Sequence, residues 1–206
     1  MTKDSQIVPN LIVISMRKIN FIFAFILVTL VLLSIASFTF AQTTKNLELP
    51  EFKSIYVNSN YTVYVKQTNK QEVTVEALTE IWELTSVKVE NGVLMVNVDR
   101  KPDTPNKSIW AKIDDIKVKP TMKIMVSVKN INELQVNGGG KIISENSIAS
   151  DYMSLSVAGS GGIELDLKGN NLKTEISGSG NVTLKGYAST NDIVMSGSGS
   201  NECLLL

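Results

Sequence analysis

The sequence predicts an all-β protein: a parallel β-solenoid of short stacked strands, preceded by an irregular N-terminal cap. Three observations predict it. A Gly-Ser-Gly triplet recurs every 19 residues, apolar residues alternate on both sides of each triplet, and polar turn signals separate the remaining strand patterns. Self-similarity at a short period is typical of stacked repeats, because one unit cannot bury its own apolar face. We therefore expect a rigid β-rod rather than an enzyme cleft.

The triplets mark the predicted corners of the stack. They occupy residues 159–161, 178–180 and 197–199, and a looser copy at 138–140 lies 21 residues ahead of the first. Stacked strands lie about 4.8 Å apart, so equivalent residues form columns. Glycine lets the backbone bend with φ above zero and leaves no Cβ to collide with the neighbouring coil, while the serines are placed to exchange hydroxyl hydrogen bonds. The predicted corner residues are Gly138, Gly140, Gly159, Ser160, Gly161, Gly178, Ser179, Gly180, Gly197, Ser198 and Gly199.

Alternation around the triplets defines the predicted inward positions. They are Leu155, Val157, Ile163 and Leu165 at the first triplet, Leu172, Ile176, Val182 and Leu184 at the second, and Ile193, Met195, Asn201 and Cys203 at the third. Asn201 and Cys203 are the weaker match. An antiparallel array, in which each triplet is a hairpin turn, is the alternative fold.

The region before the triplets also alternates with period two, which indicates half-buried strands. Glu90-Asn91-Gly92 predicts a tight turn between two of them. Residues 77–84 break the alternation and fit one or two helical turns, and residues 101–108 form a polar loop with two prolines. The predicted strands lie around residues 55–57, 62–66, 73–77, 87–89, 94–98, 124–128 and 134–136.

The first 41 residues read as a signal peptide. Arg17 and Lys18 precede a long apolar run, which ends in the small residue Ala41 before a polar stretch. Translation from Met16 would retain every part of this signal. An uncleaved anchor is the alternative, because the run is long enough to span a bilayer as a helix. We expect cleavage, which leaves residues 42–206 as a single domain, exported to the periplasm, to the outer membrane surface or out of the cell.

The amino-acid composition argues against several classes of function. The chain has 20 basic and 20 acidic residues and no basic patch, which argues against nucleic-acid binding. It has no histidine, so the usual general base near neutral pH and the commonest zinc ligand are missing. The single cysteine excludes an internal disulfide framework. We expect Cys203 to be packed and structural, and we expect neither a cofactor nor a metal.

The C-terminal end presents an unusual pattern. Three leucines close the sequence seven residues after Gly199, whereas a solenoid needs a polar cap on its last coil. We expect either an open end that docks onto another molecule or a truncated chain.

Acidic and aromatic residues are the candidates for a binding site. Asp114 and Asp115 would face opposite sides of a strand, a poor geometry for an acid/base pair. Glu164, Asp166 and Glu175 face outward and would suit sugar or calcium, but the changing sign of the column favours a solvated face. The early aromatics would suit carbohydrate stacking if exposed, although packing is favoured. These aromatics are Tyr56, Tyr61, Tyr64, Trp82 and Trp110.

Several of these features together resemble the head GIN domain family, a group of auto-transporter adhesin-like proteins common in Bacteroidetes-type bacteria. The resemblance rests on the signal, on residues 51–57, on residues 87–94 and on the serial Ser-Gly-Ser-Gly corners. It implies a right-handed β-solenoid exported to the envelope, with no established activity and no catalytic residues to transfer.

Three functional hypotheses follow. The first is a non-enzymatic envelope or surface module that presents a flat, repetitive face for adhesion or scaffolding. The second is a structural envelope protein that self-associates through an open edge strand. The third, a carbohydrate-active β-helix enzyme, is opposed by the missing histidine and by the absence of an acidic column. Partners are not specified beyond an envelope polysaccharide, an envelope protein or a second copy of the chain.

Overall fold

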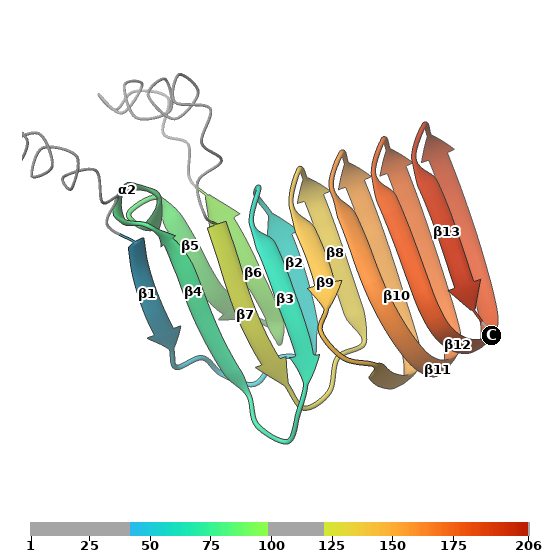
Figure 1. Cartoon of the computed structure of the whole chain (residues 1–206), viewed down its shortest axis with the longest axis horizontal. Helices are drawn as coiled ribbons and strands as arrows, with labels where there is room; N and C mark the ends of the chain where they lie inside the picture. Colours follow the sequence, from blue (N-terminus) through green and yellow to red (C-terminus); the bar gives the residue numbers. More distant parts are fainter. Residues whose placement is uncertain (1–41, 99–121, 206) are drawn as a thin grey trace, which may run out of the picture. The chain divides into compact units, whose positions relative to one another are not determined.

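The computed structural model describes residues 42–98 and 122–205, which belong to one compact unit. Within these residues the chain forms one mostly parallel, curled sheet of thirteen strands and the short helix α2 (Thr79–Trp82) (Figure 1). The strands are β1 (Gln42–Leu47), β2 (Ser54–Asn58), β3 (Thr62–Gln67), β4 (Glu72–Leu78), β5 (Thr85–Glu90), β6 (Val93–Val98), β7 (Met122–Val128), β8 (Glu133–Gly138), β9 (Lys141–Ser144), β10 (Ile148–Gly159), β11 (Gly162–Gly178), β12 (Asn181–Gly197) and β13 (Ser200–Leu205).

Several predictions lie outside the described residues: the signal peptide, the loop at 101–108, Trp110, and the pair Asp114 and Asp115. No helix in the described part of the chain has the length and apolarity needed to cross a membrane.

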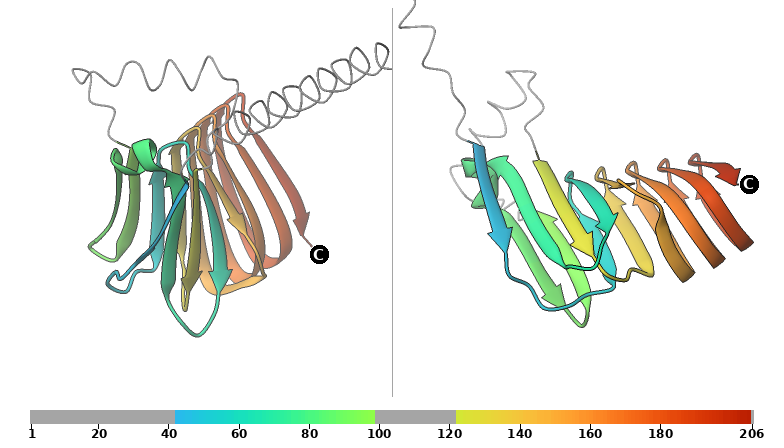
Figure 2. Two further views of the ribbon diagram at one scale, coloured as in Figure 1. Left: turned by 60° about the vertical axis from the view of Figure 1, so that its left-hand side comes forward. Right: turned by 60° about the horizontal axis from the view of Figure 1, so that its bottom comes forward.

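The sheet curls so that two half-sheets face each other across the core (Figures 1 and 2). One half-sheet runs β1-β4-β7-β3-β9, and the other runs β8-β2-β6-β5. Strand β11 joins them, because its first residues pair with β9 and its last with β10. We call the half-sheet that contains β3 the first and the one that contains β2 the second. The enclosed core consists almost entirely of aliphatic side chains.

The all-β prediction is confirmed, and the repeating strands pair in parallel. Gly159 aligns with Gly178, and Gly178 with Gly197, an offset of 19 residues, while Gly138 aligns with Gly159. The alternative antiparallel array is wrong for β10 to β13. Each triplet leads the chain from one half-sheet to the other, so successive strands on the same half-sheet run in the same direction.

The first glycine of each triplet adopts a backbone conformation that other residues rarely reach. Gly138, Gly159, Gly178 and Gly197 have φ of 109°, 117°, 111° and 116°. A Cβ on Gly178 would lie 2.7 Å from the carbonyl oxygen of Gly159. The predicted serine ladder differs: the backbone N–H of Ser179 donates to the Gly159 carbonyl at 2.8 Å, and no bond joins the three serine hydroxyls within the described residues. Because the backbones of neighbouring corners approach closely, the backbone amide of the serine, rather than its hydroxyl, links one corner to the next.

Burial follows the predicted alternation in all but the last coil. The inward positions around the first two triplets are at most 3% exposed. Ile193 and Met195 are instead 42% and 46% exposed, and Cys203 is exposed rather than packed. Among the described strands, residues 187–197 of β12 pair only with β11, and β13 pairs only with β12, so no further strand covers these side chains.

The N-terminal half, predicted as an irregular cap, consists of regular strands. Strands β2 and β3 continue the parallel pairing, whereas β1–β4, β4–β7 and β5–β6 are antiparallel. The predicted turn at Asn91 and Gly92 is confirmed, with φ of 52° and 78°. The predicted helical turn is α2.

Candidate functional site

The outer face of the second half-sheet carries a row of amide side chains. Asn58 donates from Nδ2 to Oδ1 of Asn97 at 2.9 Å, and Asn137 donates to Oδ1 of Asn58 at 2.8 Å. The three residues align because β2 pairs in parallel with both β6 and β8, and because alternation turns them outward together. Each amide orients the next, so the row holds aligned donors and acceptors at the surface.

A neighbouring group on the same face is also polar. The Tyr56 hydroxyl donates to a carboxylate oxygen of Glu133 at 2.8 Å. This hydrogen bond, assisted by partial burial, raises the pKa of Tyr56 above its ordinary value. The half-buried hydroxyls of Ser154 and Ser156 extend the polar surface onto β10. We call this surface, from Asn97 to Ser156, the amide face.

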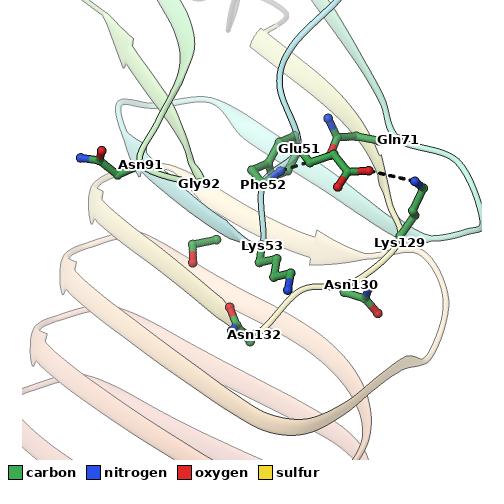
Figure 3. A pocket seen from close by; sticks show the side chains of 10 residues that line it. Glu51, Phe52, Lys53, Gln71, Asn91, Gly92, Lys129, Asn130 and Asn132 are labelled. Atoms are coloured by element: carbon green, nitrogen blue, oxygen red, sulfur yellow. Dashed lines mark hydrogen bonds and ion pairs between the residues drawn. The ribbon is translucent and has the colours of Figure 1, made fainter.

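A hollow of about 310 Å³ lies where four connections meet (Figure 3). The connection before β2, Gln71 before β4, the β5–β6 turn and the β7–β8 loop contribute its walls. Its lining residues are Glu51, Phe52, Lys53, Ser54, Gln71, Asn91, Gly92, Lys129, Asn130 and Asn132. Most of them are polar, so the hollow suits a hydrated, hydrogen-bonding ligand.

Hydrogen bonds fix the walls of this hollow. Gln71 donates to the carbonyl of Pro50 at 2.9 Å and accepts from the Phe52 amide at 3.3 Å. The Phe52 side chain is buried, which anchors the segment in the core. The Lys53 amide donates to the Gly92 carbonyl at 3.0 Å, and the Lys53 carbonyl accepts from the Asn132 amide at 2.9 Å. The Lys53 backbone is thereby held between two loops.

The charges in the hollow are unequal. Lys129 and Glu51 form an ion pair at 2.9 Å, and the hydrogen bond from Lys129 holds the pKa of Glu51 below its ordinary value. The exposed ammonium of Lys53 has no ion-pair partner within the described residues. The charge of Lys53 also helps to lower the pKa of Glu51, so two lysines share one carboxylate and the lining carries a net positive charge.

Comparison with protein families identifies the chain. The model of the family described as "Putative auto-transporter adhesin, head GIN domain" matches residues 51–204. This chain belongs to that family. The family is adhesin-like, and the match covers nearly all of the sequence after the apolar leader.

Solved structures similar to this head GIN domain come from Parabacteroides, Bacteroides and Clostridium species. A putative lipid binding protein from Parabacteroides distasonis is 17% identical with a TM-score of 0.61, over 79% of this chain and 74% of that one. A putative adhesin from Bacteroides fragilis is 16% identical with a TM-score of 0.48, over 80% and 98%. The first likeness supports the fold alone. A search of the curated proteins finds no match.

Of the predicted acidic candidates of this head GIN domain, Glu164 and Asp166 line one small surface hollow with Lys185, whereas Glu175 lies on the part of β11 that pairs with β10. Glu164 forms an ion pair with Lys141, and Glu175 with Lys173 at 2.7 Å. The hydrogen bond with Glu175 raises the pKa of Lys173. Asp166 pairs in register with Lys185. Within the described residues no three potential metal-ligating side chains come together, and the lysines leave these carboxylates as parts of a charged, solvated face.

The aromatic residues divide between core and surface. Tyr61 is fully buried, and its hydroxyl lies 2.8 Å from that of Thr85. Lys45 lies 4.4 Å above the Trp82 ring, a cation–π contact. Sequence reasoning considered only the early aromatics and missed Tyr152 and Tyr187, which are about half exposed at 50% and 51%. Their place beside breaks in the alternation, at Asp151 and Gly186, is the signal that could have found them.

The hollow itself was also missed. Its residues belong to four connections that are distant in the sequence, and none carries a recognisable motif. The resemblance quoted residues 51–57 and 87–94, which include Lys53 and Asn91, but only as family signatures. The predicted corner glycines lie at the other ends of the strands (Figure 1).

Proposed function

We propose that this chain is an exported, non-enzymatic surface module that binds or scaffolds as an adhesin, with the amide face as its main contact surface. Membership of an adhesin-like family supports this role and supports a location in the envelope or outside the cell. The observation that carries the proposal is the row Asn97, Asn58 and Asn137, whose amides are already aligned by hydrogen bonds. Such preorganisation lowers the cost of binding.

We further infer that the repeating half is a right-handed β-solenoid with 19-residue coils. The constant parallel register of β10 to β12 supports the stack, and right-handed crossovers are the general rule between parallel strands of one sheet. The corner glycines would then hold the rod rigid behind the amide face. Residues 1–41 are proposed to be the signal peptide, and residues 42–206 the exported domain.

A non-enzymatic role agrees with the side chains present. The sequence has no histidine, and the outward carboxylates Glu164 and Glu175 are paired with lysines. We expect no turnover of envelope polysaccharides, and reducing-sugar release from a polysaccharide panel would contradict this part of the proposal.

Binding by matched surface variants tests the role of the amide face. The full chain, coated on beads, is tested for retention by purified envelope polysaccharides and envelope proteins. Ser156→Arg places a bulky charge on the amide face, and Thr183→Arg places the same group on the outer side of the first half-sheet. We expect the first variant to abolish retention and the second to preserve it. Equal retention by both variants would contradict the proposal.

A second candidate function is self-association through the edge at β12 and β13. Ile193, Met195 and Leu204 are 42%, 46% and 57% exposed, a concentration of apolar surface that favours contact with a second copy. Light scattering across a concentration series tests this function, and a monomer at every concentration would contradict it.

A further inference from the structure

The hollow between the four connections has the size of a small-ligand site. Its volume of about 310 Å³ falls near the lower end of the range for such sites, roughly 300–1,000 Å³. Binding residues are commonly placed on loops that a rigid sheet holds in position. Here strands β2, β4, β6 and β8 hold the loops, so the hollow is a defined feature of the fold.

The charged side chains of the lining determine the charge of a suitable ligand. Lys129 and Glu51 neutralise each other across the rim at 2.9 Å. The exposed Lys53 ammonium forms no ion pair within the described residues and acts on Glu51 only as a second, weaker influence, so the lining keeps a net positive charge. Figure 3 shows the Lys53 side chain extending toward the loop with Asn130 and Asn132. A ligand with a single negative charge complements this lining.

The amide side chains of the lining determine which polar groups a suitable ligand carries. The side chains of Asn91, Asn130 and Asn132 line the hollow and make no intramolecular hydrogen bond in the part of the chain that the structure describes. An asparagine amide both donates and accepts. Figure 3 shows the Asn91 side chain pointing away from Lys53, so Asn130 and Asn132, on the loop toward which Lys53 extends, are the amides on the same side as its charge. A sugar hydroxyl also donates and accepts, so these two amides and one cation match a ring with several hydroxyls and one acidic group.

The lining is held in place before any ligand arrives. The Lys53 backbone bonds on both sides, to Gly92 and to Asn132, and Gln71 fixes the preceding segment. The two anchored loops therefore need no large rearrangement, which reduces the ordering cost of binding.

We propose that this hollow binds a carboxylate-bearing sugar, with Lys53 contacting the carboxylate and the asparagine amides contacting the hydroxyls. This inference rests on the proposed function, because it gives the adhesin-like surface a specific class of ligand. A neutral sugar leaves the net positive charge of the lining unmatched. A simple carboxylate leaves the amides unused.

The test compares displayed sugars on the full chain. The protein is captured on a biosensor, and polymers that display glucuronic acid or N-acetylneuraminic acid are titrated against it. Polymers that display glucose or propionate supply the neutral and the hydroxyl-free controls. Lys53→Gln removes the charge from the hollow, and Lys168→Gln removes an exposed lysine on β11, outside the hollow, as the matched control.

We expect an acidic-sugar polymer to bind, Lys53→Gln to weaken binding by roughly tenfold, and Lys168→Gln to leave it unchanged. Added salt should weaken binding, since a charge contact contributes. Absence of binding to both acidic polymers, equal binding by Lys53→Gln, or equal binding of the propionate polymer would overturn the inference. The bead assay with Ser156→Arg reports separately on the amide face, so failure of the acidic-sugar site and failure of the amide-face proposal are distinguishable.

Discussion

The two halves of this domain reach a similar sheet geometry by different means. In the repeating half, from β10 to β13, backbone meets backbone at the corners, and the column of glycines with positive φ permits it. In the N-terminal half, side chains such as Gln71 tie the connections together. The repeat favours regularity and an even face, whereas the varied connections create the hollow. Regular stacking thus supplies the scaffold, and departure from the repeat supplies the hollow.

The largest effect is expected when a substitution disrupts the column of corner glycines. Gly178→Val places a β-branched side chain at φ of 111°, with its Cβ 2.7 Å from the Gly159 carbonyl oxygen. We expect the free energy of unfolding to fall by about 2–6 kcal/mol, from backbone strain and overpacking together. Urea denaturation measures it. Ser179→Ala is the matched control and should change stability by less than about 0.5 kcal/mol. Equal stability of Gly178→Val and the parent would refute the stacked corner.

The second largest effect is expected when a buried polar group is removed from the repeating half. Thr174 is fully buried and aligns with Leu155 and Ile193 on the two neighbouring strands, and its hydroxyl has no hydrogen-bond partner among the residues that the structure describes. Thr174→Val replaces the hydroxyl with a methyl group, so we expect a gain of about 1–3 kcal/mol. Thermal unfolding shows it as a higher Tm. A lower Tm would mean that the hydroxyl has a partner in solution.

A smaller effect is expected when a side-chain hydrogen bond in the N-terminal half is removed. Tyr61→Phe removes the hydroxyl that lies 2.8 Å from Thr85 within the core. We expect a loss of about 0.5–1.5 kcal/mol in the free energy of unfolding. Tyr64→Phe, on the outer side of β3, the strand that begins directly after Tyr61, is the control and should be nearly neutral. Equal losses in the two variants would show that the Thr85 contact contributes nothing.

The smallest effect concerns the rim of the hollow. The hydrogen bond from Lys129 lowers the pKa of Glu51, so the associated stability is present above the ordinary carboxyl pKa and is lost as pH falls through the lowered value. Because Glu51 is exposed, the pKa is a better readout than unfolding. An NMR titration of its carboxyl carbon should show a rise in pKa in Lys129→Gln. An unchanged value would mean that the ion pair is absent in solution.

The sequence predicted the repeating half well and the N-terminal half in outline. The 19-residue spacing of Gly159, Gly178 and Gly197 determines a parallel register, because equivalent residues must stack. Alternation also located the strands around Val57 and Val126, since period two reports the inward face wherever one side is buried. The pairing order of β1 to β9 was not predictable, because alternation carries no information about which strand is the neighbour.

The candidate site depended on features that local patterns do not record. Lys53, Asn91 and Asn132 meet only because three connections converge in the folded sheet. The predicted packing of Cys203 was wrong because inward orientation does not guarantee a covering strand. The carboxylates of Glu164 and Glu175 looked available in the sequence, since their lysine partners are assigned only by the side-chain geometry.

The central claim is that this chain is an exported surface module. Protease shaving of intact cells tests it most directly, with immunoblotting of the chain and of a periplasmic marker in the same sample. We predict that external protease removes the described domain while the periplasmic marker survives. Protection of the chain until the outer barrier is broken would contradict a surface role and would restrict its partners to the periplasm.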